Sequence, residues 1–397
     1  MNRAGVMENA ARPGPSEHRP RRLCFVAPFG YPLLAGDRNM PFAGGAEVQQ
    51  CTLAREFVRR GWQVSMVSMD FGQPDGIVVD GVTVHRMHAH KAGLPGLRFF
   101  HPRLTSLWAA LRRADADIYY QRVGSALTGL VAAFARLHRR AFVFASASDM
   151  DFVPELPFIR YARDRRLYAY GLARADAVVA QSPAQRIACA ANFRREAQVI
   201  RSGYGHTGKP ARRDGVVLWA GTLKDMKRPE LFVELARRLP RHRFRLVGGN
   251  ELGSKGTHEA SLRALACGLD NIEFTGFVPF VDVEAQFDGA ALLVNTSAAE
   301  GFPNTFLQAW SRGTPTVSFF DPGAEVDGRA VGGVVASIDA MAQEVDRLMQ
   351  SEAAWRQRSR DAAAYFQQHF SAATVVQTYE DVFAMVRPAR RATVGGA

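Results

Sequence analysis

The chain has 397 residues, 47% of them hydrophobic and 22% charged, and its formal net charge is +12. This length predicts two domains, and the composition is typical of globular proteins. No apolar run approaches the roughly 20 residues that cross a bilayer, and the N-terminus lacks the apolar core of a signal peptide, so a cytoplasmic location is expected. The four cysteines are far apart, which argues against a zinc site or a disulfide framework.

The excess positive charge is mostly arginine and occurs in small clusters, such as Arg163, Arg165 and Arg166, or the run from Arg237 to Arg245. Three explanations stay open: an anionic membrane surface, nucleic acid, or the arginine usage of a GC-rich genome. No helix-turn-helix, zinc-finger or RNP-type signature accompanies the charge. We therefore expect no nucleic-acid partner and favour peripheral association with the inner membrane.

Residues 1–20 are polar and contain three prolines, which predicts a disordered leader. Residues 21–205 then alternate strand and helix patterns, as in a Rossmann-like domain. A strand at 23–28 and a loop at 29–42 lead to Gly44 and Gly45, which open a helix. The strand at 141–148 brings Asp149 to the carboxyl edge of the sheet, where α/β folds keep working residues. A helix cap or turn is the alternative role for Asp149.

Two segments of this half allow more than one interpretation. Residues 158–173 combine arginines with aromatic residues, and this helix either contacts a membrane interface or packs on its own domain. The histidines His85, His88 and His90 lie on an alternating strand and do not converge with a carboxylate, so no metal site is expected.

Residues 206–372 repeat the alternation and form the second predicted domain. The strand at 216–221 leads into a loop that carries Thr222, Lys224 and Lys227, ahead of an amphipathic helix. The strand at 244–247 ends in Gly248 and Gly249, where the absence of side chains lets a ligand approach the backbone. Residues 373–397 are predicted to be a last helix with a basic tail.

The most informative stretch runs from Leu292 to Val317 and reads as strand, polar turn, helix and strand. Glu300 stands at the mouth of the turn, and the helix is predicted to begin near Pro303, with Pro303 in its first turn. The N–H groups of residues 304–306 would then point outward and provide a seat for phosphate. Gln308 lies eight residues beyond Glu300 and is expected to face the same ligand.

This stretch resembles the donor site of retaining GT-B glycosyltransferases of family four, the bacterial group 1 type. The resemblance implies that Glu300 contacts the transferred sugar and that Lys227 clamps the donor diphosphate. Gln308 occupies the ribose-contacting position, where the family has glutamate, and Thr222 stands where an arginine is expected. Asp149 follows Ser148, which occupies the place of a family histidine. The same resemblance implies donor contacts from Gly44, Gly45, Lys224, Gly248, Gly249, Gly301, Phe302, Pro303, Asn304 and Thr305.

The resemblance implies an α/β GT-B fold, with two Rossmann-like domains facing a central cleft and a C-terminal helix that crosses back to the first domain. It also implies transfer of a sugar, with retention, from a nucleotide diphosphate sugar to a glycan or lipid-linked acceptor, as in cell-surface polysaccharide or glycolipid assembly. No cofactor and no metal are expected. The alternatives are a non-catalytic nucleotide-sugar-binding protein and, less favoured, a nucleic-acid-binding protein.

Overall fold

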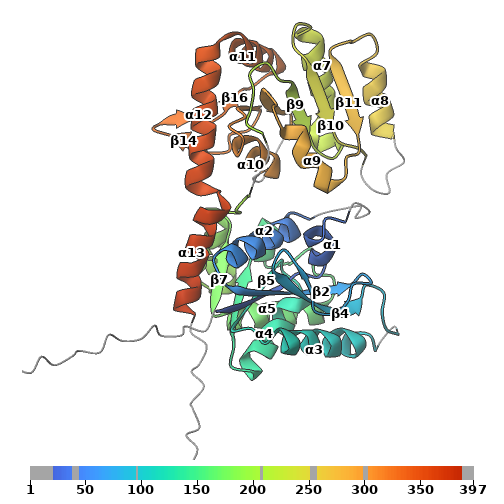
Figure 1. Ribbon diagram of the computed structural model, residues 1–397, viewed down its shortest axis with the longest axis vertical. Helices are drawn as coiled ribbons and strands as arrows, with labels where there is room; N and C mark the ends of the chain where they lie inside the picture. Colours follow the sequence, from blue (N-terminus) through green and yellow to red (C-terminus); the bar gives the residue numbers. More distant parts are fainter. Residues whose placement is uncertain are drawn as a thin grey trace, which may run out of the picture.

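Two α/β domains are stacked along the long axis of the molecule (Figure 1). The structure is a computed structural model that describes residues 21–37, 44–94, 97–205, 209–250, 257–297 and 303–386. Each domain has a largely parallel sheet covered by helices, which confirms the predicted pair of Rossmann-like domains. In the described part of the chain, no helix is both long and apolar enough to cross a membrane.

The first domain is built on an eight-stranded sheet of order β3-β4-β2-β1-β5-β6-β7-β8. All its neighbours pair in parallel except the β3 and β4 pair. The strands are β1 (Arg22–Val26), β2 (Gln63–Asp70), β3 (Ile77–Val79), β4 (Val82–Ala89), β5 (Ile118–Arg122), β6 (Ala141–Ala145), β7 (Ala177–Ala180) and β8 (Gln198–Val199). The helices are α1 (Gly30–Leu34), α2 (Gly45–Arg59), η1 (Phe99–Leu104), α3 (Thr105–Ala114), α4 (Ala126–Leu137), η2 (Asp149–Phe152), α5 (Ala162–Arg174) and α6 (Pro183–Phe193).

The second domain is built on a six-stranded parallel sheet of order β11-β10-β9-β12-β13-β16. Its strands are β9 (Val217–Ala220), β10 (Phe244–Val247), β11 (Ile272–Gly276), β12 (Leu292–Asn295), β13 (Thr316–Ser318) and β16 (Gly333–Val334), with a separate hairpin of β14 (Glu325–Val326) and β15 (Arg329–Ala330). Its helices are η3 (Asp225–Lys227), α7 (Pro229–Arg238), α8 (Thr257–Leu265), α9 (Phe280–Phe287), α10 (Asn304–Trp310), α11 (Ile338–Gln350), α12 (Glu352–His369) and α13 (Ala372–Met385).

Both sheets have a topological switch point, where successive connections leave in opposite directions. In the first sheet β1 lies between β2 and β5, and in the second β9 lies between β10 and β12. In open α/β sheets the crevice outside the carboxyl ends of the strands at such a point is the usual ligand site. The loops after β9 and β12, and those after β1 and β5, are therefore the candidate ligand-binding loops.

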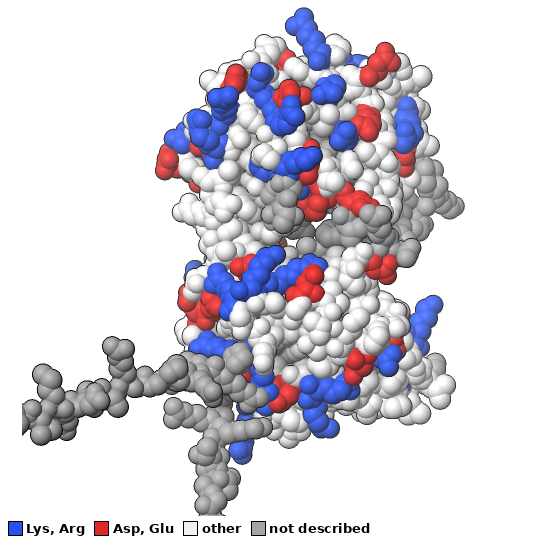
Figure 2. All heavy atoms as spheres, viewed as in Figure 1, with Lys and Arg blue, Asp and Glu red and all other residues white. Residues whose placement is uncertain are grey.

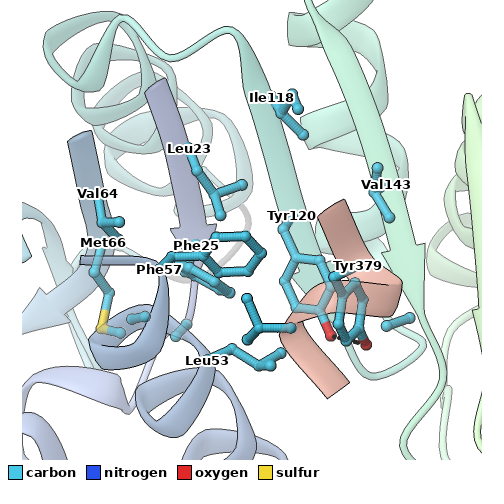
Figure 3. Packing of buried hydrophobic residues seen from close by; sticks show 14 of the residues in the cluster. Leu23, Phe25, Leu53, Phe57, Val64, Met66, Ile118, Tyr120, Val143 and Tyr379 are labelled. Carbon is cyan, nitrogen blue, oxygen red and sulfur yellow. Dashed lines mark hydrogen bonds between the residues drawn. The ribbon is translucent and has the colours of Figure 1, made fainter. Parts of the chain in front are cut away.

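Helix α13 leaves the second domain and packs on the first, as predicted (Figure 1). Figure 3 shows Tyr379 of α13 beside Tyr120 of β5 in the core of the first domain; their hydroxyls are 3.1 Å apart. Glu380 accepts hydrogen bonds from Arg60 and from the indole of Trp62. This helix therefore completes the core of a domain from which it is distant in sequence.

The two chain segments that cross between the domains run side by side. The N–H of Tyr204 donates to the carbonyl of Phe370 at 2.7 Å, and the N–H of Ala372 donates back to the carbonyl of Tyr204 at 3.1 Å. These two hydrogen bonds therefore join the two crossings to each other between the domains.

The structure corrects one local prediction and shows how a second segment packs. The loop predicted over residues 29–42 contains helix α1, whose residues Pro32, Leu33 and Leu34 are buried, so packing overrides the weak helix propensity there. The arginine- and aromatic-rich helix α5 packs tightly on α4, since a Cβ on Gly129 would lie 2.2 Å from the carbonyl oxygen of Leu167. Its buried residues are Tyr168, Gly171 and Leu172, whereas Arg165 and Arg166 are exposed, so contact of this helix with a membrane interface stays a prediction.

Candidate functional site

The loops that follow β9 and β12 are tied to each other at the switch point of the second sheet. The indole N–H of Trp219 donates to the hydroxyl of Thr296 at 2.9 Å, and that hydroxyl donates to the main-chain carbonyl of Lys227 at 2.7 Å. Thr296 is completely buried. The Lys227 side chain is thus carried on a loop that is fixed against the strand leading towards Glu300.

Arg228 makes a second tie between these loops. Its guanidinium donates to the carbonyls of Thr296 and Ser297, at 2.8 and 3.1 Å, and lies 4.8 Å from the centre of the Phe319 ring. Its main chain is left-handed, with φ 46°. The charge of Arg228 therefore holds the loops together, a positioning role that no sequence pattern indicated for Arg228 or Thr296.

Replacing Thr296 by the isosteric valine is expected to lower the free energy of unfolding by about 2 kcal/mol. The reason is that the substitution leaves the buried indole N–H of Trp219 without an acceptor, whereas shape is conserved. Urea unfolding would measure the change. Thr378→Val is the matched control, because its hydroxyl is on an exposed residue of α13; an equal loss of stability in both variants would contradict the proposed tie.

The other predicted residues of the β9 loop stand around Lys227. Thr222 is exposed, whereas Lys224 is half-buried and occupies the N-cap position of η3. Lys227 is the last residue of η3 and is also half-buried. The structure therefore brings all three onto one short loop beside the switch point.

Helix α10 differs from its prediction at its first turn. Pro303 is the N-cap residue, with an extended main chain, and the helix starts at Asn304. The N–H of Phe306 donates to the carbonyl of Pro303 at 3.0 Å, so it does not point outward as predicted. The amides of Asn304 and Thr305 remain the candidates for a phosphate seat. Three predicted residues, Glu300, Gly301 and Phe302, lie outside the described residues.

The glycine loop of the first domain faces this helix. Gly44 is the N-cap of α2 and Gly45 its first residue, and a Cβ on Gly45 would lie 3.0 Å from the side-chain amide nitrogen of Asn304. The two domains therefore approach each other where α2 and α10 both begin. A residue with a side chain at position 45 would crowd this approach.

Gln308 is turned into the second domain. It is only 6% exposed, and its amide donates to Glu284 of α9 at 2.8 Å. Glu284 also pairs with the buried guanidinium of Arg312, which bonds Asp288 as well. This bond uses only the amide nitrogen of Gln308, so contact between its side-chain oxygen and a ribose stays a prediction.

Gly248 and Gly249 are required by chain packing. Gly248 has φ 149°, and a Cβ there would lie 1.8 Å from the carbonyl oxygen of Gly221. A Cβ on Gly249 would lie 2.8 Å from that of Phe277. The close approaches that these glycines allow are thus to neighbouring backbone and side chain, and their predicted donor contact stays a prediction.

Asp149 and Asp151, in the loop after β6, differ in their exposure and in their hydrogen-bond partners. Asp149 is exposed and accepts a hydrogen bond from the side chain of Gln185 at 2.9 Å. Asp151 is buried and accepts N–H groups from Gly124, Ala147 and Ser148, joining the loops after β5 and β6. Burial raises the pKa of Asp151, and these three N–H bonds oppose the rise. The N-cap of η2 is Ser148, whose hydroxyl accepts the N–H of Met150, and Asp151 completes the capping box, so the capping role does not fall to Asp149.

Several arginines of the sequence clusters are paired with carboxylates within the fold. Arg237 and Arg238 both pair with Glu234, and Arg245 pairs with Glu273. On the face drawn in Figure 2, Lys and Arg are interspersed with Asp and Glu over both domains. This mixed pattern differs from the continuous basic stripe that is the footprint of nucleic-acid binding.

Two family models match the chain one after the other. The model for a glycosyl transferase 4-like domain matches residues 44–205, and the model for glycosyl transferases group 1 matches residues 214–351. The first range covers most of the eight-stranded sheet, and the second contains the loops after β9 and β12.

Individual proteins show the same similarity. Mannosylfructose-phosphate synthase of Agrobacterium fabrum is 34% identical over 129 residues, a stretch that spans 30% of this chain and 27% of that protein. Sucrose-phosphate synthase from Thermosynechococcus elongatus (19% identity) and HepE of Anabaena in complex with UDP and glucose (17% identity) each have a TM-score of 0.66, and each match covers 92% of this chain and 99% of the other. The two matched models thus identify a glycosyl transferase 4-like domain followed by a glycosyl transferases group 1 domain, and the shared architecture shows that the chain has the GT-B fold.

Proposed function

We propose that the protein transfers a sugar from a nucleotide diphosphate sugar to a hydroxyl acceptor, with retention of configuration at the transferred carbon. The observation that carries this proposal is the tie between the β9 and β12 loops, which fixes Lys227 beside the strand that leads to Glu300. Gly45 of the first domain faces Asn304 across from it. A donor lying at this switch point would contact both domains.

The chemistry needs charge stabilisation more than a protein nucleophile. Negative charge grows on the departing nucleoside diphosphate, and the Lys227 ammonium and the amides of Asn304 and Thr305 are suited to stabilise it. Glu300 would accept hydrogen bonds from the donor sugar. The acceptor hydroxyl would attack from the side of the leaving group and pass its proton to a donor phosphate oxygen, which gives retention without a covalent intermediate.

For the acceptor we propose a glycan or a lipid-linked saccharide, in the assembly of surface polysaccharide or glycolipid at a membrane. The residual basic charge of the chain supports an anionic surface as the setting. A small phosphorylated sugar is the second candidate, because the names of two similar proteins are those of sugar-phosphate synthases.

Donor binding is tested by thermal unfolding with a panel of UDP-, GDP-, ADP- and dTDP-sugars. A donor present at a hundredfold excess over its Kd should add about 2.7 kcal/mol to the free energy of unfolding. We expect one nucleotide to stand out, and Glu300→Ala to lose the shift. Turnover of that donor would distinguish a transferase from a binding protein. Absence of stabilisation by every donor would count against the proposed function.

A further inference from the structure

A cavity of about 460 Å³ lies in the first domain, between the segment that follows β4 and the start of α5. Its lining includes Arg98, Phe99, Arg103, Tyr161 and Arg163. The guanidinium of Arg163 lies 3.7 Å from the centre of the Phe99 ring, so the two segments are in contact beside the cavity. Both segments follow the carboxyl ends of strands, which places the cavity at the same edge of the sheet as Gly45.

The positive charge in this cavity is incompletely compensated. Arg163 pairs with Asp164 at 2.8 Å. Within the described ranges, by contrast, neither Arg98 nor Arg103 has a carboxylate partner, and the Nε of Arg103 is buried without a hydrogen-bond acceptor. A buried guanidinium N–H without an acceptor is unfavourable, and oxygen atoms of a phosphate match its geometry. The cavity therefore favours an anionic group.

Apolar side chains lie beside the cavity that Arg98 and Arg103 line. A second cavity of about 210 Å³ shares Phe99, Arg103 and Arg163 with the first, and its further lining is largely apolar, from residues such as Met69 and Leu107. Leu97 and Phe100, in and beside η1, are 65% and 61% exposed. A free anion would pair with the arginines but leave these side chains in water. A lipid surface offers phosphate and an apolar phase together.

We infer that this part of the first domain docks on an anionic membrane, with a lipid phosphate in the Arg98 and Arg103 cavity and with Leu97 and Phe100 inserted beside it. We name these four residues the docking surface. Docking here would hold the carboxyl edge of the first domain near a membrane-embedded acceptor. The inference rests on the proposed function only for this choice of acceptor class.

Co-sedimentation with vesicles tests the docking surface directly. The protein should bind vesicles of phosphatidylcholine mixed with phosphatidylglycerol, and not vesicles of phosphatidylcholine alone. Arg98→Glu should weaken this binding about 30-fold, since each unit of charge near an anionic surface contributes about fivefold and the reversal changes the charge by two units. Arg98 is exposed, so this variant keeps the fold. Arg136→Glu is the matched control, an equal change of charge at the opposite edge of the sheet, where α4 ends.

The apolar part has its own pair of variants. Phe100→Ser should weaken vesicle binding about tenfold. Leu137→Ser, at a residue that is 67% exposed at the end of α4, should leave it unchanged. Equal weakening by the test and control variants would show nonspecific attraction and overturn the inference.

Two further outcomes separate this inference from the proposed function. Failure of the unaltered protein to bind anionic vesicles, or its release by millimolar inorganic phosphate, would overturn docking in favour of a soluble phosphate ligand. Donor stabilisation of Arg98→Glu should equal that of the unaltered protein, because none of the proposed donor contacts involves a residue of the docking surface. Vesicle binding without any donor stabilisation would support docking and count against the proposed transferase.

Discussion

Replacing Lys227 by alanine should slow sugar transfer by about 10²–10³-fold, the usual effect of removing one group that stabilises charge on a leaving group. The loss should appear in kcat as well as in the donor KM, because negative charge on the diphosphate increases as the bond breaks. The fold should be retained, since Lys227 is held through its main-chain carbonyl, which alanine also has. Steady-state kinetics over a range of donor concentrations would measure both quantities.

Lys209→Ala is the matched control for this experiment. It removes the same charge from an exposed residue near the start of the second domain, and its kinetics should not change. Glu300→Ala should abolish transfer independently, because the residue is expected to contact the donor sugar. Normal turnover in both Lys227→Ala and Glu300→Ala would place the donor site elsewhere.

Replacing Gln308 by glutamate should destabilise the protein by about 1–3 kcal/mol near pH 7 and should not improve donor binding. The family has glutamate at this position, and the resemblance by itself implies a tolerated change. In the structure, however, the new carboxylate would be buried next to Glu284, which Gln308 now contacts at 2.8 Å. Three carboxylates would then share Arg312.

The pH dependence of this loss has a defined sign. Burial and the adjacent Glu284 should raise the pKa of the introduced carboxyl above its unfolded value of about 4.3. The folded variant therefore binds more protons than the unfolded chain between these two pKa values, and its deficit should shrink as the pH falls towards 4. Denaturant unfolding of both proteins at pH 7 and pH 5 would measure this trend.

The exchanged pair, Glu284→Gln with Gln308→Glu, provides the control. It restores one amide and one carboxylate beside Arg312, so most of the lost stability should return. If the single and double variants are equally unstable, repulsion between the two carboxylates is not the cause.

The sequence by itself determined the strand and helix alternation of both domains, because apolar periodicity is a local signal that the buried sheets impose. It also predicted a last helix, α13, whose buried face is formed by Val375, Val376, Tyr379, Val382 and Phe383, whereas its crossing back to the first domain was implied by the family resemblance. The short motifs after two predicted strands also placed Lys227 in a loop ahead of a helix and placed the start of α10 near Pro303. Helix α1 was not predicted, since its stability comes from packing rather than from local propensity.

Only the tertiary structure decided how the candidate site is held and which residues are free to act. Thr296 and Arg228 join loops that are about 70 residues apart in the chain, and such ties leave no periodic signal in the sequence. Gln308 has the spacing of a ligand residue, yet its hydrogen bond goes to Glu284 on another helix. Side-chain partners are set by the packing of distant segments, which local pattern does not encode.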